Sequence, residues 1–138
     1  MSTDAKVFTK PKLVAAEPQL FVADVTASCA FFTNKLGFSI VFTYGEPPYY
    51  AQVRRDGAAL NLRCVEGDAI DAVLRDREEL LSASITVATA GEITQLARDF
   101  QHVGVSFAQA LAKKPWGALD FIVRDIDGNL LLFAGPAE

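Results

Sequence analysis

The sequence has 138 residues, of which 51% are hydrophobic and 22% are charged, and its formal net charge is −4. This composition excludes an intrinsically disordered chain and suffices for the core of one compact domain. The acidic and basic residues are scattered, which argues against a nucleic-acid partner, because nucleic-acid-binding proteins present clustered basic residues.

Membrane and export signals are missing from the pattern. No stretch approaches the ~18 apolar residues that span a bilayer, and residues 1–12 lack the apolar region of a signal peptide. The sequence therefore predicts a cytoplasmic protein with no membrane partner. Cys29 and Cys64 are isolated thiols, not a C-x-x-C pair, and we expect them to be small buried hydrophobic residues.

The first half of the chain begins with an arm, residues 1–16, which is either flexible or an added edge strand. A strand is expected over 19–22 and a helix over 27–36, with the Thr26 hydroxyl as its N-cap and Gly37 at its end. Three more strands are expected over residues 38–44, 49–54 and 59–64. Asp56-Gly57 is a strong signal for a hairpin turn between the last two.

The second half repeats this order after a charged connector over residues 66–80, which has room for a short helix. Residues 82–87 alternate strictly between polar and apolar, as a half-buried strand does. A helix follows, with Thr89 as a possible cap, a buried stripe through Leu96 and Phe100, and Gly104 at its end. Three strands are then expected over residues 105–110, 119–124 and 129–133. Each half is thus a βαβββ module, and two such modules can bury their helix-facing sides together.

Four stretches carry a family resemblance, and they occur in order along the chain. They are the strand and helix start from Leu20 to Val25, the Leu36-Gly37-Phe38 element, Lys114-Pro115-Trp116-Gly117, and the turn Asp125-Ile126-Asp127-Gly128-Asn129. Over residues 17–134 the chain resembles the glyoxalase/bleomycin-resistance/dioxygenase superfamily, also called the vicinal-oxygen-chelate superfamily, and within it the bleomycin-resistance proteins in particular.

The resemblance implies an α+β fold in which two tandem βαβββ modules form a curved mixed sheet around a concave cleft. We expect a single domain over residues 17–135, with module 1 over 17–65, the connector over 66–80 and module 2 over 81–135. Relatives are commonly dimers, so a homodimer is expected. The family includes metal-dependent enzymes and metal-free drug-binding proteins, so the fold does not decide the chemistry.

The metal ligands of the metal-dependent relatives occupy four inward positions, one on the first and one on the last strand of each module. Carried over by the resemblance, these positions are Glu17, Asn61, Ser82 and Leu132. Transition metals prefer carboxylate, imidazole and thiolate donors, and only Glu17 offers one of these. The single histidine, His102, lies near the end of the second module's helix, remote from the four positions. We therefore expect no metal, no other cofactor and no catalytic residue.

Strand alternation and the loops define the expected ligand-binding surface. It combines neutral hydrogen-bonding groups with apolar and aromatic wall, which is typical of small-molecule sites. Tyr49 or Tyr50, together with Trp116, would offer stacking surfaces at its rim. The expected ligand-binding residues are Glu17, Gln19, Phe21, Tyr49, Tyr50, Asn61, Arg63, Ser82, Ser84, Trp116 and Leu132.

Three functions remain open at this level. The first is metal-free binding of a small molecule, which the acidic charge and Glu17 would bias toward a cationic aromatic drug. The second is a metal-dependent lyase or dioxygenase with an atypical ligand set. The third is a dimerisation module without a saturable pocket. The four metal positions favour the first, a binding protein without catalysis.

Overall fold

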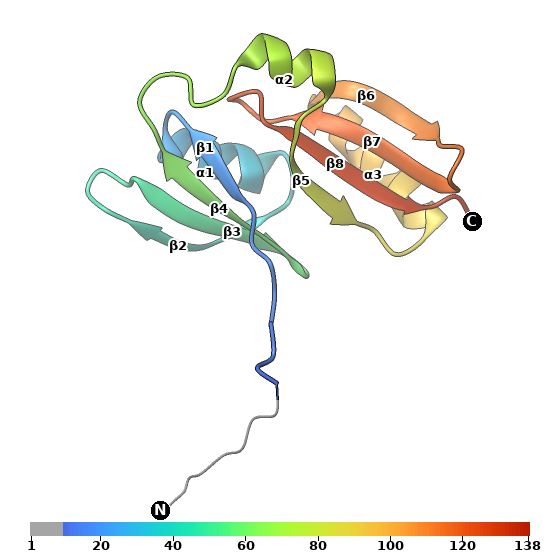
Figure 1. The fold of residues 1–138 in the computed structure, drawn as a ribbon, viewed down its shortest axis with the longest axis horizontal. Coiled ribbons are helices and arrows are strands. Elements are labelled where there is room, and N and C mark those ends of the chain that lie inside the picture. The colour runs from blue at the N-terminus through green and yellow to red at the C-terminus, as the bar shows by residue number, and fades with distance from the viewer. Residues whose placement is uncertain (1–9) are drawn as a thin grey trace, which may run out of the picture.

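The computed structural model describes residues 10–138, which form eight strands and three helices (Figure 1). In chain order these elements are β1 (Gln19–Val22), α1 (Val25–Asn34), β2 (Ser39–Tyr44), β3 (Tyr50–Arg55), β4 (Ala58–Cys64), α2 (Ala72–Glu78), β5 (Leu81–Thr86), α3 (Ala90–His102), β6 (Ser106–Lys113), β7 (Ala118–Arg124) and β8 (Leu130–Pro136). None of the helices in this described part is long and apolar enough to cross a membrane.

The strands form two four-stranded mixed sheets of the same topology. The first has the order β1-β4-β3-β2 and the second the order β5-β8-β7-β6. In each sheet the first strand pairs in parallel with the last, and the remaining pairs are antiparallel. The α+β fold with two βαβββ modules, predicted from the sequence, is confirmed, with one sheet in each module.

Local capping explains where the two long helices begin and end. The Asp24 carboxylate, not the Thr26 hydroxyl, caps α1 by accepting a hydrogen bond from the Ala27 amide at 3.0 Å. The predicted N-cap is therefore wrong by two residues. Asp24 lies before Thr26 and has the extended backbone of an N-cap residue, so its carboxylate takes that role. Thr89 does cap α3: its hydroxyl accepts from the Glu92 amide at 3.1 Å and donates to the Glu92 carboxylate at 2.9 Å.

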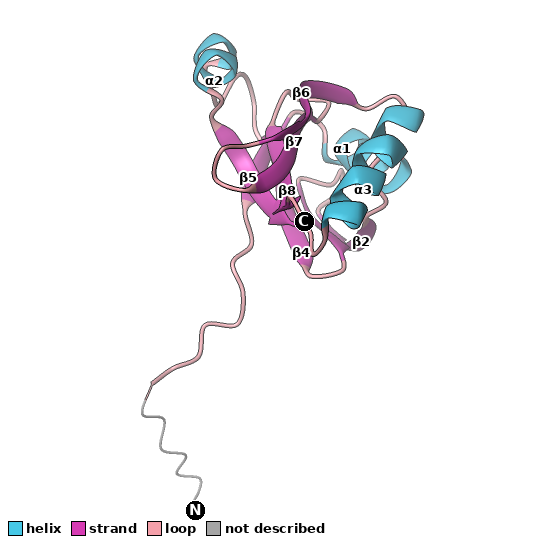
Figure 2. Ribbon diagram, turned by 90° about the vertical axis from the view of Figure 1, so that its right-hand side faces the viewer, coloured by secondary structure: helices cyan, strands magenta, loops and turns pink. Residues whose placement is uncertain are grey.

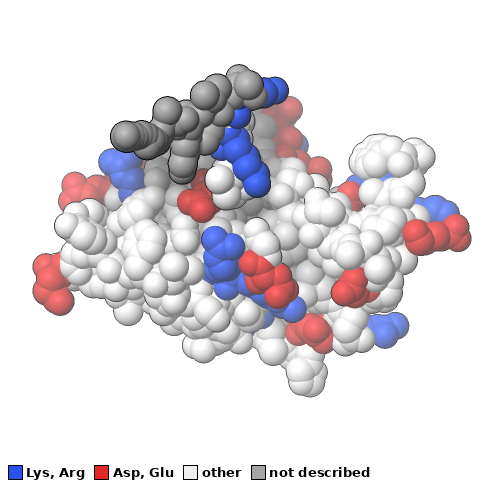
Figure 3. Space-filling view, turned by 90° about the horizontal axis from the view of Figure 1, so that it is seen from below, with Lys and Arg blue, Asp and Glu red and all other residues white. Residues whose placement is uncertain are grey.

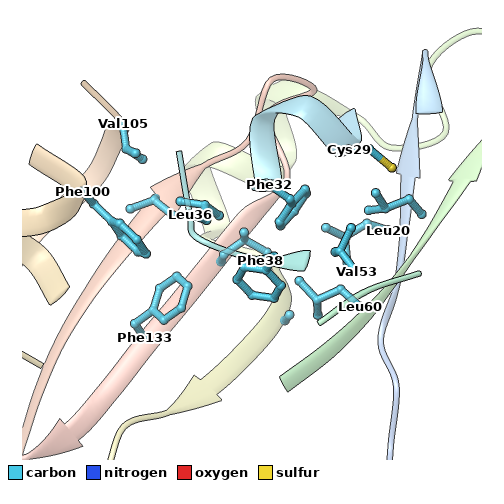
Figure 4. Close-up of a cluster of buried hydrophobic side chains, with 14 of the residues drawn as sticks. Leu20, Cys29, Phe32, Leu36, Phe38, Val53, Leu60, Phe100, Val105 and Phe133 are labelled. Carbon is cyan, nitrogen blue, oxygen red and sulfur yellow. The ribbon is translucent and has the colours of Figure 1, made fainter. Parts of the chain in front are cut away.

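One hydrophobic core joins the two modules. Figure 2 shows α1 and α3 on one side of the strands and α2 on the other. The strand residues that face α1 and α3 are buried. Leu36 and Phe38, which follow α1 in the chain, belong to the same core cluster as residues of module 2. Phe38, Phe100 and Phe133 are members of this shared cluster (Figure 4). The modules are thus held by apolar burial, which scales with the area removed from water.

A second link between the modules is polar and lies in the turn between β7 and β8. Asp125 organises the turn by accepting hydrogen bonds from the Asp127 amide at 2.9 Å, the Asn129 amide at 2.8 Å and the Asn129 side chain at 2.9 Å. Asn129 Nδ2 donates onward to the Phe21 carbonyl at 3.0 Å, and Asp127 Oδ1 accepts from the Ala23 amide at 2.9 Å. The turn of module 2 therefore satisfies backbone groups at the end of β1 in module 1.

The N-terminal arm enters the described part of the chain at residue 10, and residues 1–9 lie outside it. Residues 11–17 are exposed and form neither helix nor strand. Leu13 is 93% exposed and Val14 is 88% exposed. Of the two expectations for the arm, an added edge strand is therefore not present in residues 10–16 of a single chain.

The Asp125 turn generates a stability prediction. Burial raises the pKa of Asp125, while the hydrogen bonds from Asn129 and Asp127 oppose that rise. In Asp125→Ala, three N–H groups lose their acceptor, and a buried unpaired donor costs about 1–3 kcal/mol. Relief of the desolvated carboxylate offsets part of this loss, so we expect the free energy of unfolding to fall by about 3 kcal/mol.

Urea denaturation followed by circular dichroism measures this change. Asp68→Ala is the matched control, because Asp68 is exposed in the connector, and its effect should stay within about 0.5 kcal/mol. Equal denaturation midpoints for Asp125→Ala and the parent would show that the turn does not hold the modules together.

Candidate functional site

A polar cluster lies on the face of the first sheet that points away from α1. Gln52 on β3 donates from Nε2 to Glu17 Oε1 at 3.1 Å and to Asn61 Oδ1 on β4 at 2.9 Å. Gln52 is 9% exposed, whereas Glu17 is exposed and Asn61 half-buried. A carboxylate only accepts hydrogen bonds, so Glu17 fixes the orientation of the Gln52 amide. At two of the four expected metal positions, Glu17 and Asn61, a side-chain oxygen therefore already accepts a hydrogen bond.

The corresponding polar residue in module 2 is engaged as well. Ser82 on β5 donates from its hydroxyl to Asn129 Oδ1 at 3.1 Å. That bond ties Ser82 to the turn between β7 and β8, and a serine hydroxyl is in any case a weak ligand for transition metals compared with carboxylate or imidazole.

The fourth position offers no donor at all. Leu132 lies on β8, where it pairs with Ser84 on β5 and with Ile122 on β7. Across residues 10–138, no three His, Cys, Asp or Glu side chains gather where they could hold a metal ion. The residues at the four positions therefore do not fit the transition-metal site of metal-dependent relatives.

Nucleophilic chemistry has no better support among the described residues. Cys29 is a buried residue of α1, and burial raises the pKa of its thiol, which favours the protonated, unreactive form. His102 is exposed in the last turn of α3. The hydrogen bonds of the described residues include no pair of a nucleophile with a histidine base, which acyl-transfer enzymes of the serine and cysteine type require.

The other predicted residues of module 1 fall on the same sheet face as the Gln52 cluster. On the parallel pair of β1 and β4, Gln19 lies opposite Asn61 and Phe21 opposite Arg63. Tyr50 on β3 lies opposite Arg63 from the other side. The structure therefore brings these five residues together on one surface, with Phe21 and Tyr50 half-buried and Gln19 and Arg63 exposed.

The aromatic residues expected at the rim lie far apart in a single chain. Tyr49 packs edge-on against Tyr44 at 5.8 Å in the turn between β2 and β3. Trp116 is 74% exposed in the turn between β6 and β7, with Lys114 Nζ 6.0 Å from its ring. Figure 1 places these two turns at opposite ends of the molecule. One site within a single chain therefore does not contain both rings.

Module 2 carries a polar cluster that sequence reasoning missed. Gln109 on β6 donates to Asp120 Oδ1 on β7 at 2.7 Å and accepts from Lys114 Nζ at 2.9 Å. Lys114 lies 3.7 Å from the buried Asp120 carboxylate, which completes a compact triad next to the Trp116 turn. The pairing of β6 with β7 contains two register shifts, so counting from the turn does not reveal that these residues meet.

Gln52 was also missed, although a signal for it was present. The Asp56-Gly57 hairpin fixes the register of β3 on β4, and counting outward from that turn places Gln52 opposite Asn61. Once Asn61 was selected as an inward residue, Gln52 followed as its cross-strand neighbour.

A separate cavity does not lie over these clusters. It has a volume of about 780 Å³ and lies at the seam between the modules, between the turn joining β3 to β4, the end of β5 and α3. Of the residues predicted to bind a ligand, Ser84 alone lines it. We call this space the seam cavity. The strand ends that border it point to the underside of the molecule, where charged side chains of both signs lie together (Figure 3).

A family model described as the Glyoxalase/Bleomycin resistance protein/Dioxygenase superfamily matches residues 13–133. No curated protein matches the sequence.

Solved structures of the same fold include proteins with different described roles. A glyoxalase/bleomycin resistance protein/dioxygenase from Alicyclobacillus acidocaldarius is 17% identical, with a TM-score of 0.71 over 95% of this chain and 96% of that one. A bleomycin-binding protein from Streptomyces verticillus, complexed with copper(II)-bleomycin, is 26% identical, with a TM-score of 0.69 over 90% of this chain and 97% of that one. A lactoylglutathione lyase from Agrobacterium tumefaciens is 16% identical, with a TM-score of 0.69 over 91% and 96%.

Proposed function

The chain belongs to the Glyoxalase/Bleomycin resistance protein/Dioxygenase superfamily, and from that premise we propose that it binds a small molecule without a metal ion and without chemistry. The observation that carries this proposal is the state of the four metal positions. Leu132 supplies no donor, Ser82 bonds to Asn129, and Gln52 occupies oxygens of both Glu17 and Asn61. A metal would have to displace these bonds and would gain a single strong ligand.

The proposed ligand is a planar cation bound on the sheet face that carries Glu17. That carboxylate forms no ion pair with a described lysine or arginine, so its negative charge stays available to a ligand. The same face holds Tyr50 and Phe21, whose rings suit a flat apolar guest, and Asn61, whose amide can donate to it. The similarity to a bleomycin-binding protein supports this class of function.

The role of Trp116 in this proposal depends on a homodimer. Since the β6–β7 turn, which holds Trp116, and the β2–β3 turn, which holds Tyr49, lie at opposite ends of the molecule, both rings can contact one ligand only where two copies face each other. One feature favours a second copy. The edge strand β2 exposes Ile40, Val41 and Phe42, and unpaired apolar edges are sites of association.

The metal prediction is that divalent ions leave the protein's stability unchanged. A metal that bound the native state would raise the free energy of unfolding by about 2.7 kcal/mol at a hundredfold excess over its Kd. We expect no change in melting temperature when nickel(II), zinc(II) or iron(II) is added to chelator-treated protein. A stoichiometric metal in protein purified without chelator, or a rise in melting temperature that a chelator reverses, would instead support the lyase or dioxygenase alternative.

The ligand prediction concerns Glu17 and uses two tricyclic probes, the cation proflavine and its uncharged relative acridine. Glu17→Gln removes one charge and keeps the acceptor for Gln52. A hydrogen bond to a charged group contributes about 1.5–3 kcal/mol, so proflavine affinity should fall by about 10- to 100-fold while acridine affinity stays the same. Glu66→Gln, at an exposed carboxylate in the connector, is the control. Calorimetry in which Glu17→Gln binds proflavine as the parent does would remove Glu17 from the site.

The dimer prediction is that the protein sediments as a homodimer at micromolar concentration. Trp116→Ala should then weaken proflavine by about one to two decades in Kd, because losing a buried stacking ring costs about 1–3 kcal/mol. A monomer in sedimentation, together with unchanged proflavine binding by Trp116→Ala, would confine the ligand to module 1 of one chain.

A further inference from the structure

The seam cavity has the chemistry of a second binding site, separate from the sheet face that carries Glu17. At about 780 Å³ its volume lies within the usual range for small-molecule sites, about 300–1,000 Å³. Its inner wall is apolar and comes from both modules: Phe38 and Leu60 from module 1, and Leu96 and Phe133 from module 2. An apolar wall of this kind accepts an aryl or alkyl group.

Carboxylates stand on two sides of the mouth of the cavity. Glu92 and Asp99 lie on α3, seven residues apart, and share one face of the helix with Leu96. Asp56 faces the cavity from the turn between β3 and β4. Arg55 is the single basic residue among the lining side chains, and its Nη1 donates to the Leu36 carbonyl at 2.8 Å. The lining therefore carries three carboxylates against one guanidinium.

None of these carboxylates is neutralised by a described cation. Within residues 10–138 no lysine, arginine or histidine nitrogen lies within 4.0 Å of Asp56, Glu92 or Asp99 in an ion pair. Their present partners are neutral: Glu92 accepts from the Thr89 hydroxyl at 2.9 Å, and Asp99 accepts from Gln95 Nε2 at 2.8 Å. Two carboxylates on one helix stripe next to an apolar wall favour a ligand that brings a positive charge.

We propose that the seam cavity binds an amphipathic primary amine, with its apolar part against Leu96, Leu60 and Phe133 and its ammonium group between α3 and the Asp56 turn. A primary ammonium has three N–H donors, enough to reach carboxylates on two sides at once. Ser84 and Thr86 on β5 also line the cavity. This site goes beyond the proposed function, because it shares neither Glu17 nor the sheet-face rings with it.

The experiment uses the full-length chain and two probes of the same shape, 4-phenylbutylamine, which is charged at neutral pH, and 4-phenylbutan-1-ol, which is not. Binding is followed by backbone amide shifts of α3 and of the Asp56 turn in ¹⁵N-labelled protein. The parent should bind the amine saturably and the alcohol at least tenfold more weakly. The double variant Glu92→Gln with Asp99→Asn should bind the amine about tenfold more weakly and the alcohol unchanged.

The variants are chosen to keep the fold. Glu92→Gln keeps a side-chain acceptor for the Thr89 hydroxyl, and Asp99→Asn keeps an acceptor for Gln95. Leu96→Trp fills the cavity from a half-buried helix position and should weaken both probes. Glu66→Gln, at an exposed carboxylate of the connector, is the matched control, and it should bind the amine as the parent does. Amide shifts of α3 and of the Asp56 turn report on the seam cavity, so their loss is distinguishable from a loss of binding at the sheet face that carries Glu17.

Two results would overturn the proposal. The first is amine binding that is the same in the parent, in the double variant and in Leu96→Trp, which would place the probe elsewhere. The second is a set of intermolecular nuclear Overhauser contacts between Leu13 of one copy and Leu96 of another. Such contacts would assign the seam cavity to the exposed arm of a second chain, which carries Lys10 and Lys12 beside Leu13 and so has a related chemistry.

Discussion

The turn from Asp125 to Asn129 holds together three parts of the molecule that are distant in sequence. Its own shape comes from the Asp125 carboxylate, and its outward polar groups bond to the backbone of β1 in module 1. The connector reaches the same turn, because Arg75 on α2 is buried and donates from Nη2 to the Asp127 carbonyl at 3.4 Å. Residue 128 has a φ of +81°, a backbone conformation that L side chains rarely adopt, so the turn favours glycine there, and the guanidinium of Arg75 lies directly beside it. The relative placement of the two sheets depends on these contacts and on the shared core.

That placement has two consequences for function. Each sheet keeps one face for the core and leaves the other for polar residues, which gather into the Gln52 cluster in module 1 and the Gln109 triad in module 2. Between the sheets, the end of β5 and the start of β4 leave the seam cavity, which α3 borders with its acidic stripe. The polar sheet faces and the seam cavity are thus two different kinds of surface, and the lining of the seam cavity includes none of the four expected metal positions.

Most of the fold was predictable because its signals are local. The helix-ending glycines at 37 and 104, the Thr89 cap and the Asp56-Gly57 hairpin each fix backbone geometry within a few residues. Because the two modules repeat the same order of elements, each prediction made for one module also applies to the other. The error at the N-cap of α1 has the same local origin, since Asp24 and Thr26 are both good caps and only the observed backbone distinguishes them.

The candidate site was less predictable, because it depends on how distant elements meet. Alternation predicts Glu17, Asn61 and Arg63 on one face, yet it gives no distance between Tyr49 and Trp116, whose turns lie at opposite ends of the molecule. The helix pattern of α3 assigned Leu96 to the buried stripe, whereas it is half-buried beside the seam cavity. Glu92 and Asp99 form part of a candidate binding site only because the β3–β4 turn lies opposite them. That arrangement depends on tertiary structure, which the helix pattern alone does not reveal.

The central claim is that the protein binds its ligand without a metal ion. Native mass spectrometry of chelator-free protein incubated with equimolar proflavine and nickel(II) tests it in one spectrum. The account predicts a mass increase that corresponds to proflavine and none that corresponds to nickel. A species with one nickel ion per chain, and proflavine bound only to that species, would contradict it.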